Sequence, residues 1–109
     1  MVWQILLYES TRKERPVEKF IESLEKGVSV KVARVLDLLE VYGNLLRMPY
    51  SKKLTDKIYE LRIRGTEEIR ILYSFGKKGK IYLLHGFKKK TQKTPKRETK
   101  LAKERLDSI

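Results

Sequence analysis

Two neighbouring stretches of this chain alternate apolar and polar residues, and no other feature limits the possible folds as strongly. The stretch KIYELRIRG, residues 57–65, has Tyr, Leu and Ile at one parity and Glu, Arg and Arg at the other. The stretch IRILYSF, residues 69–75, repeats the period of two. Side chains of a β-strand point to opposite faces in turn. The sequence therefore predicts two adjacent strands whose apolar faces join one core.

A third strand follows directly. The turn GKKG, residues 76–79, leads into KIYLLHGF, residues 80–87, which is apolar at both parities. Such a strand is typical of a central position, or of a strand that is covered on both faces. Short connections favour an antiparallel meander of the three strands. The stretch VWQILLY, residues 2–8, is a further predicted strand that we expect to join the same sheet.

Two helices are predicted between the first strand and the meander. Pro16 suits the first position of a helix, and Gly27 suits the residue just after its end. Ser29 suits the N-cap of a second helix, which ends at Gly43. We expect the two helices to form a hairpin that covers one face of the sheet, and residues 44–56 to be a connector.

The chain ends in a further predicted helix. Thr94 and Pro95 suit its N-cap and first position, and Leu101, Ala102 and Leu106 give it a narrow apolar stripe. The order strand, helix, helix, three strands, helix predicts an α+β fold, with the helix pair packed on an antiparallel sheet. A chain of 109 residues is too short for two domains with useful cores, so we expect one domain over residues 1–109.

The chain is strongly basic. It holds 26 Lys and Arg residues against 14 Asp and Glu residues, a net charge of +12. Such an excess predicts a polyanionic partner, most often nucleic acid, with a membrane surface as the rival. No apolar run is long enough for a transmembrane helix, and charged residues from Glu9 onward argue against a signal peptide. We therefore expect a cytoplasmic protein without a membrane partner.

Composition also narrows the chemistry. The chain has no cysteine, so neither a disulfide framework nor a thiolate nucleophile is present. One histidine and scattered acidic residues form no recognisable metal-binding constellation. We therefore expect neither a metal nor another cofactor.

The polar face of the meander concentrates arginines. Arg62, Arg64 and Arg70 have the parity opposite to the apolar residues. If the helices cover the apolar face, these arginines face outward on an open sheet, where guanidinium groups suit phosphate oxygens. The alternative is a solvated face on which Glu60 pairs with one of them. The lysines that we expect to extend this surface toward RNA are Lys53, Lys57, Lys88, Lys89, Lys90, Lys93 and Lys96.

His85 and the lysines beside it each have two interpretations. His85 is either a proton donor or acceptor near neutral pH, or a half-buried histidine bonded to backbone. Its parity places it inward with Ile81 and Leu83, whereas Gly86 allows a bulge that re-aims it. The lysine run after His85 is either crowded enough that like charges lower the pKa of one lysine, which then serves as an acid or base, or it is solvated and supplies only positive charge.

Several of these features recur together in one known family. They are Glu60-Leu61-Arg62, Arg70 before an apolar strand, and LHGFKKKTQKTP at residues 84–95. In this combination the chain resembles the RelE/ParE superfamily of toxins from type II toxin–antitoxin systems. It is most similar to the HigB-like branch, also described as phage-derived Gp49-like proteins. The resemblance covers residues 53–106, and the upstream strand–helix–helix order agrees.

The resemblance implies a RelE-like fold and a mechanism. Such toxins are ribonucleases that cut messenger RNA in the ribosomal A site without a metal. The RNA 2′-hydroxyl attacks the adjacent phosphate and leaves a 2′,3′-cyclic phosphate end. Arg70 matches the phosphate-stabilising arginine, and Arg62 and Arg64 match basic residues of the preceding strand. The general acid stays unassigned among His85, Lys88, Lys89 and Lys90, because the terminal helix lacks the tyrosine that some relatives use.

The resemblance also implies partners and leaves rival functions open. We expect the ribosome, messenger RNA and a cognate antitoxin, which in this branch usually carries a helix-turn-helix domain. ParE-like relatives instead poison DNA gyrase and are not nucleases. A third hypothesis is a basic module that binds RNA or DNA without catalysis, with an affinity that falls steeply with salt.

Overall fold

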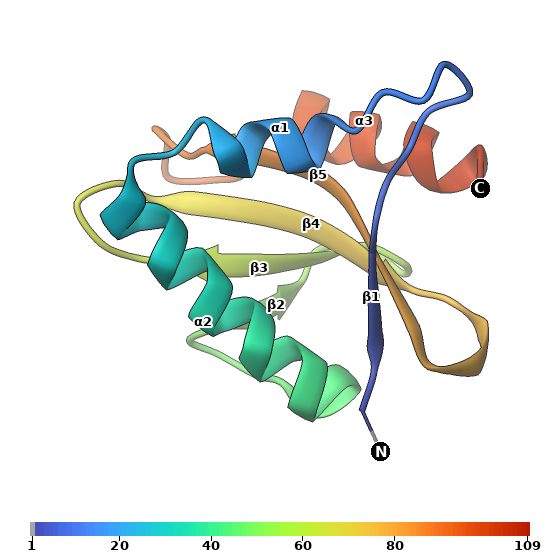
Figure 1. The fold of residues 1–109 in the computed structure, drawn as a ribbon, viewed down its shortest axis with the longest axis horizontal. Coiled ribbons are helices and arrows are strands. Elements are labelled where there is room, and N and C mark those ends of the chain that lie inside the picture. The colour runs from blue at the N-terminus through green and yellow to red at the C-terminus, as the bar shows by residue number, and fades with distance from the viewer. Residues whose placement is uncertain (1) are drawn as a thin grey trace.

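The computed structural model describes residues 2–109, and over this range the chain forms one sheet of five strands and three α-helices. The strand order across the sheet is β1-β5-β4-β3-β2. The strands are β1 (Gln4–Leu7), β2 (Ser51–Lys53), β3 (Tyr59–Ile63), β4 (Ile69–Phe75) and β5 (Lys80–Lys88). The helices are α1 (Pro16–Glu22), α2 (Lys26–Tyr42) and α3 (Lys96–Asp107). Figure 1 shows α1 and α2 in front of the sheet and α3 behind it.

The predicted α+β fold and its meander are confirmed. Strands β3, β4 and β5 pair antiparallel in sequence order. The first strand joins the sheet as predicted, but it lies parallel to β5 and makes the sheet mixed. The predicted connector over residues 44–56 also contains β2, a short edge strand that pairs antiparallel with β3. Three residues are too few for a visible alternation, which is why the sequence did not indicate this strand.

Two apolar clusters lie on opposite faces of the sheet. The larger cluster joins Val32 and Leu39 of α2 to Leu61 and Ile71 of the meander, so the prediction that the helix pair covers this face is confirmed. The smaller cluster gathers side chains of the sheet's other face against Ala102 of α3. The meander is therefore covered on both faces. The expectation of an open sheet behind the arginines is therefore only partly correct: α3 packs over part of this face, whereas Arg62 and Arg64 line a hollow that stays open.

Several predicted helix ends differ from the structure. Helix α1 ends at Glu22, and Gly27 lies inside α2 instead of capping α1. Ser29 is not an N-cap, since its hydroxyl donates to the carbonyl of Lys26 in the first turn of α2. Gly43 does end α2, with φ of +50°. Apolar periodicity locates helices well and their ends poorly, because capping choices are local and nearly equal in free energy.

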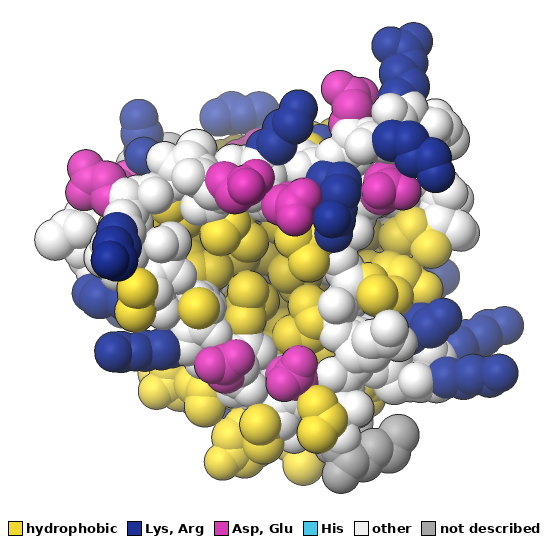
Figure 2. Space-filling model, in the orientation of Figure 1, with side chains coloured by type: hydrophobic (Ala, Val, Ile, Leu, Met, Phe, Trp, Pro, Cys, Tyr) yellow, Lys and Arg dark blue, Asp and Glu magenta, His cyan; other side chains and the backbone are white. Residues whose placement is uncertain are grey.

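The face that carries α1 and α2 has mixed charge. Figure 2 shows acidic and basic side chains side by side around an apolar centre on this face. In the part of the chain that the structure describes, no helix is long and apolar enough to cross a membrane.

Candidate nucleic-acid interface

The candidate site lies on the face of the meander that α3 partly covers. On this face Arg62 of β3 stands directly opposite Arg70 of β4. Two like charges across a strand pair repel each other, so their pairing requires a compensating group. Glu60, two residues before Arg62 and on the same face, is that group.

Glu60 organises the centre of the site. Its side chain is 1% exposed, and its Oε1 accepts a hydrogen bond from Nε of Arg62 at 3.1 Å. Nε of Arg70 lies 3.6 Å from the same oxygen. The hydroxyl of Thr94 donates to Oε2. One buried carboxylate therefore fixes two guanidinium groups and ties the segment before α3 to the sheet.

Arg70 is fixed from several sides. Its side chain is only 3% exposed, so it forms part of the floor of the site. The prediction that Arg70 projects outward into solvent is therefore wrong. Nη1 donates to the carbonyl of Ile69 at 3.1 Å, and Nη2 donates to Oε1 of Glu68 at 3.0 Å. Among the described residues, no acceptor forms a hydrogen bond with its Nε. The guanidinium is thus held in one orientation with an unused donor.

Two adjoining hollows open above these residues, and together we call them the basic hollow. One has a volume of about 460 Å³ and the other about 740 Å³. They share Arg62, Lys89 and Gln92 in their walls. The remaining cationic residues of the basic hollow are Lys52, Lys93, Lys96 and Lys100 on one side and Arg64, Arg70 and Lys90 on the other.

Lys89, which lines both halves of the basic hollow, has a lowered pKa. Burial lowers the pKa of its amino group, and the positive charges of Arg70, Arg62 and Lys52 lower it further. The carboxylate of Glu60 opposes this shift. Its backbone N–H donates to the carbonyl of Glu68 at 2.8 Å, which anchors the segment at the rim. A lysine with a lowered pKa gives up its proton more readily than a free lysine and suits proton transfer.

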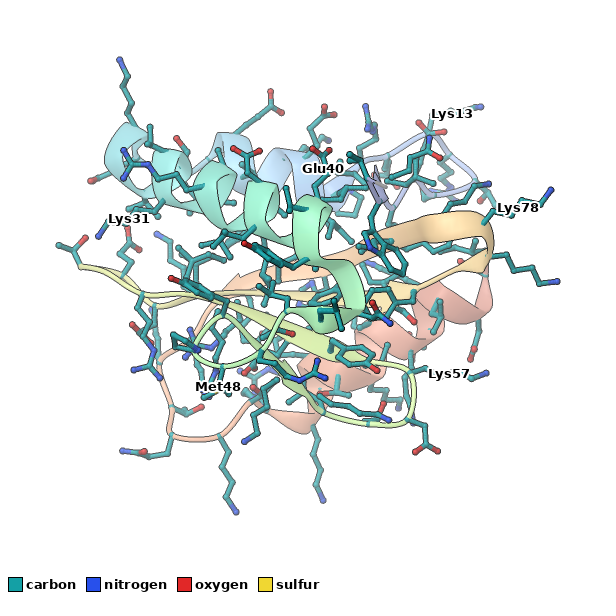
Figure 3. The ribbon with its side chains drawn as sticks, turned by 90° about the horizontal axis from the view of Figure 1, so that it is seen from below. Lys13, Lys31, Glu40, Met48, Lys57 and Lys78 are labelled. Atoms are coloured by element: carbon teal, nitrogen blue, oxygen red, sulfur yellow. The ribbon has the colours of Figure 1, made fainter. Side chains whose placement is uncertain are left out.

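Three lysines predicted for this surface lie elsewhere. Lys88 stands opposite Ile69, on the other face of the sheet, and its Nζ pairs with Glu67 at 2.8 Å. Lys53 lies with its Nζ 6.0 Å from the ring centre of Tyr59, on the side away from the basic hollow. Lys57 lines a separate hollow beside Asp107. Figure 3 shows Lys57 at the opposite side of the view from Met48, whose Sδ lies 3.5 Å from Nη1 of Arg62.

His85 is not part of the basic hollow. A register shift between Leu72 and Tyr73 of β4 marks a β-bulge in the pairing with β5, and beyond it His85 stands opposite Leu72. The prediction that His85 shares a face with Ile81 and Leu83 is therefore wrong. A bulge does turn its side chain to the other face, but the bulge lies at Leu84 and not at Gly86, where the sequence suggested it. His85 Nε2 lies 3.1 Å from Oε1 of Glu98 on α3. Burial lowers the pKa of His85, against the opposing effect of Glu98.

The comparison with known protein families decides the classification. The family described as phage-derived protein Gp49-like matches residues 19–107. The chain belongs to this family. Gp49-like proteins are toxins of the RelE/HigB type, and a toxin of this kind implies an antitoxin partner. No curated protein is significantly similar to the chain.

Two further residues line the basic hollow of this Gp49-like protein, Lys52 and Thr94. Lys52 faces the basic hollow because it stands opposite Glu60 in the register of β2 and β3. Thr94 was predicted to cap the last helix, but α3 begins at Lys96 and the hydroxyl of Thr94 binds Glu60 instead. Within residues 2–109, no three His, Asp or Glu side chains gather in a group that could hold a metal ion.

Proposed function

We propose that this Gp49-like protein is an endoribonuclease that cuts messenger RNA in the ribosomal A site by a metal-independent reaction. The observation that supports the proposal best is the convergence of Arg62, Arg70 and Lys89 on one hollow, with buried Glu60 holding both guanidinium groups in place. Cations fixed in advance stabilise charge that develops on a phosphate at little cost of reorganisation.

The reaction needs three actions on one phosphodiester. The 2′-hydroxyl attacks the adjacent phosphorus, its proton leaves to solvent in the open hollow, and the P–O5′ bond breaks. Charge builds on the non-bridging oxygens of the phosphorane, and we assign its stabilisation to Arg62 at the wall and Arg70 on the floor. The leaving 5′-oxygen takes a proton. The products are a 2′,3′-cyclic phosphate and a 5′-hydroxyl.

We assign the proton donor for the 5′-oxygen to Lys89. Among the four candidates left open by the sequence, Lys89 combines a place between both halves of the basic hollow with a lowered pKa. His85 is held against Glu98 beneath α3, and Lys88 is paired with Glu67 on the other face. Lys90 lies in the wall of the larger half, and we assign it to binding of the RNA backbone together with Arg64, Lys93 and Lys96.

The proposal is tested by expression under tight control, followed by mapping of transcript 5′ ends. We expect new ends confined to translated codons. The Lys89→Ala substitution should lower cleavage about 100-fold or more, the range for loss of a general acid. Arg62→Ala should cost about 100- to 1,000-fold, as for loss of one charge-stabilising donor. Lys57→Ala is the matched control, because it removes an exposed lysine outside the basic hollow.

The same experiment separates the rival functions. Growth arrest with intact messages and DNA-damage signalling would favour gyrase poisoning. RNA binding that weakens with salt, without cleavage on programmed ribosomes, would favour the third hypothesis, a module that binds RNA without catalysis. Cleavage that survives Lys89→Ala unchanged removes Lys89 from the chemistry. Action on the ribosome would place the toxin in the cytoplasm, and the proposal extends to an antitoxin with a helix-turn-helix domain.

A further inference from the structure

Lys89 directly follows β5, and its amino group is free in the basic hollow. Its backbone N–H donates to the carbonyl of Glu68 at 2.8 Å, which fixes the position from which the side chain starts. The side chain is half-buried and lines both halves of the hollow, whereas those of Lys88 and Lys90 are exposed. Within residues 2–109, Lys89 forms no ion pair with a carboxylate, although Nζ of Lys88 lies 2.8 Å from Glu67. The amine of Lys89 is thus held in place and left available.

The surroundings of Lys89 favour the neutral form of its amine. Burial lowers the pKa of the group, and the positive charges of Arg70, Arg62 and Lys52 lower it further, against the opposing charge of Glu60. A neutral amine has a lone pair that can attack a carbonyl carbon, whereas an ammonium group has none. Lys89 therefore has the properties of a nucleophile.

The larger half of the basic hollow places an anion-binding surface beside this nucleophile. Arg62 and Arg64 line it together with Lys89, around a volume of about 740 Å³. Among the described residues that line this half, only Glu68 is acidic, and its Oε1 is already bound to Nη2 of Arg70 at 3.0 Å. The uncompensated charge is therefore positive, and guanidinium groups suit the oxygens of a phosphate.

We propose that Lys89 is a modification site that small acyl phosphates acylate, with their phosphate group held by Arg62 and Arg64. The bound phosphate places the carbonyl carbon of the reagent in front of Nζ of Lys89. The lone pair of the amine attacks this carbon and forms a C–N bond. The C–O bond to the phosphate breaks, its electron pair leaves with the phosphate, and the amine proton passes through water to the departing phosphate. The products are an amide on Lys89 and inorganic phosphate.

The charge of the hollow selects an acyl phosphate over other acyl donors. In an acyl phosphate, a single oxygen joins the phosphate to the carbonyl carbon, so one anchored group positions the reacting bond. Negative charge builds on that same phosphate as the C–O bond breaks, and fixed guanidinium groups stabilise it. A thioester has an uncharged sulfur at the reacting carbon, so these guanidinium groups neither anchor nor stabilise its leaving group.

Acylation changes the chemistry of the hollow. An amide carries no positive charge and does not act as a general acid, unlike the amino group that it replaces. In the proposed nuclease reaction Lys89 supplies a proton to the leaving oxygen, so the acylated protein should not cut messenger RNA. This consequence rests on the proposed function. The acylation itself does not, because it needs only the amine and the cations around it.

The test measures acetylation of each lysine in the purified protein by peptide mass spectrometry. One sample receives acetyl phosphate, and a second receives the N-hydroxysuccinimide ester of acetic acid, which lacks a phosphate. With acetyl phosphate, we expect Lys89 to react about tenfold faster or more than Lys53 and Lys57, which lie outside the hollow, since one fixed donor stabilises a charged group by at least this factor. Inorganic phosphate should slow the reaction of Lys89 with acetyl phosphate much more than its reaction with the ester. Equal rates at the three lysines, or equal slowing of both reagents, overturn the proposal.

The ratio of the two rates at Lys89 isolates the contribution of the phosphate. Both reagents need the neutral amine, so a change in the charge state of Lys89 cancels in the ratio. Arg62→Gln should lower the ratio about tenfold or more, because it removes one donor to the phosphate. Arg64→Gln should lower it as well, at an exposed position that contributes nothing to the ion pairs of Glu60. Arg12→Gln makes the same change at an exposed position outside the hollow and should leave the ratio unchanged. An equal fall for all three variants would show that acetyl phosphate follows net charge alone, and the proposal fails.

The effect on activity is measured with the acetylated protein on programmed ribosomes. Cleavage should fall in proportion to the acetylated fraction of Lys89 and should not follow the acetylated fractions of Lys53 and Lys57. If the unmodified protein cuts no message, the proposed nuclease function fails, while the acetylation rates still decide whether Lys89 is the modification site. If protein that is fully acetylated at Lys89 cuts as fast as the unmodified protein, the consequence for activity is refuted.

Discussion

The Glu60→Gln substitution tests the central electrostatic feature of the fold. Glutamine has nearly the shape of glutamate, so the packing stays and only the negative charge is removed. Two guanidinium groups then lose their compensation, Arg70 with 3% of its side chain exposed and Arg62 with 11% exposed. Glu68 still contacts Arg70 from the rim at 3.0 Å. We expect the variant to fold with much lower stability.

The size of the loss follows from the distances. At an effective dielectric constant of about 20, a unit charge pair at the 3.6 Å between Glu60 and Arg70 attracts by about 4–5 kcal/mol, and the closer pair with Arg62 by a similar amount. Part of this attraction offsets the cost of removing the three charges from water. Loss of one partner of a buried pair typically costs about 3–5 kcal/mol. We expect about 3–4 kcal/mol, because the amide oxygen still accepts a hydrogen bond.

The free energy of unfolding is measured by urea denaturation followed by circular dichroism. Glu68→Gln is the matched control, since it removes a carboxylate from the same Arg70 at a site where Glu68 is 40% exposed, and we expect less than about 1 kcal/mol. The double variant Glu60→Gln/Arg70→Met removes the buried carboxylate together with the more deeply buried of its two guanidinium partners, and should recover at least about 1 kcal/mol relative to Glu60→Gln alone. A loss below about 1 kcal/mol for Glu60→Gln would show that the cluster does not depend on this charge.

Three further predictions concern the rest of the fold. Burial raises the pKa of Tyr73 to about 12. Between pH 10 and 12 the Tyr73 hydroxyl therefore ionises only in the unfolded chain, and the free energy of unfolding should fall by about 2–3 kcal/mol. Urea titrations of Tyr73→Phe should lack this contribution to the fall. Burial lowers the pKa of His85 below its usual 6.5, so the unfolded chain binds the proton more readily and stability should decrease as the pH drops below 6.5; thermal melts of His85→Gln should lack that decrease. Gly43→Ala should cost about 1–3 kcal/mol and alter Trp3 fluorescence, because a Cβ there would clash with the indole Nε1 of Trp3, whereas Gly27→Ala, with no atom within 4 Å, should be neutral or slightly stabilising; equal effects of the two would contradict the clash.

The meander was predictable because its strands repeat a strong local pattern. Leu61, Ile63, Ile69 and Ile71 share the face that packs on α2, as the parity indicated. β5 is apolar at both parities because α1 and α2 cover one of its faces and α3 covers the other. β2 escaped prediction because it is three residues long and depends on pairing with β3 more than on its own composition.

The candidate site was predictable in part. Arg62, Lys89, Lys93 and Lys96 do meet in the basic hollow. The alternation alone did not reveal that Arg70 would be buried or that α3 would pack on the same face of the sheet, since a helix stripe shows that a helix packs but not which face it covers. It also did not place His85, because the bulge near Leu72 reverses the parity of β5 beyond it.

By itself, the sequence determined the α+β class, the meander, the excess of positive charge and the arginines that share one face with Glu60. These properties depend on residue type and on spacing along the chain, which the sequence contains. Only the tertiary structure decided that Glu60 is buried between two guanidinium groups, that Lys89 joins them while Lys88 does not, and that Arg62 lines both halves of the basic hollow. The reason is that each of these depends on the register of paired strands and on the packing of α3, where one residue of shift sends a side chain to the opposite face.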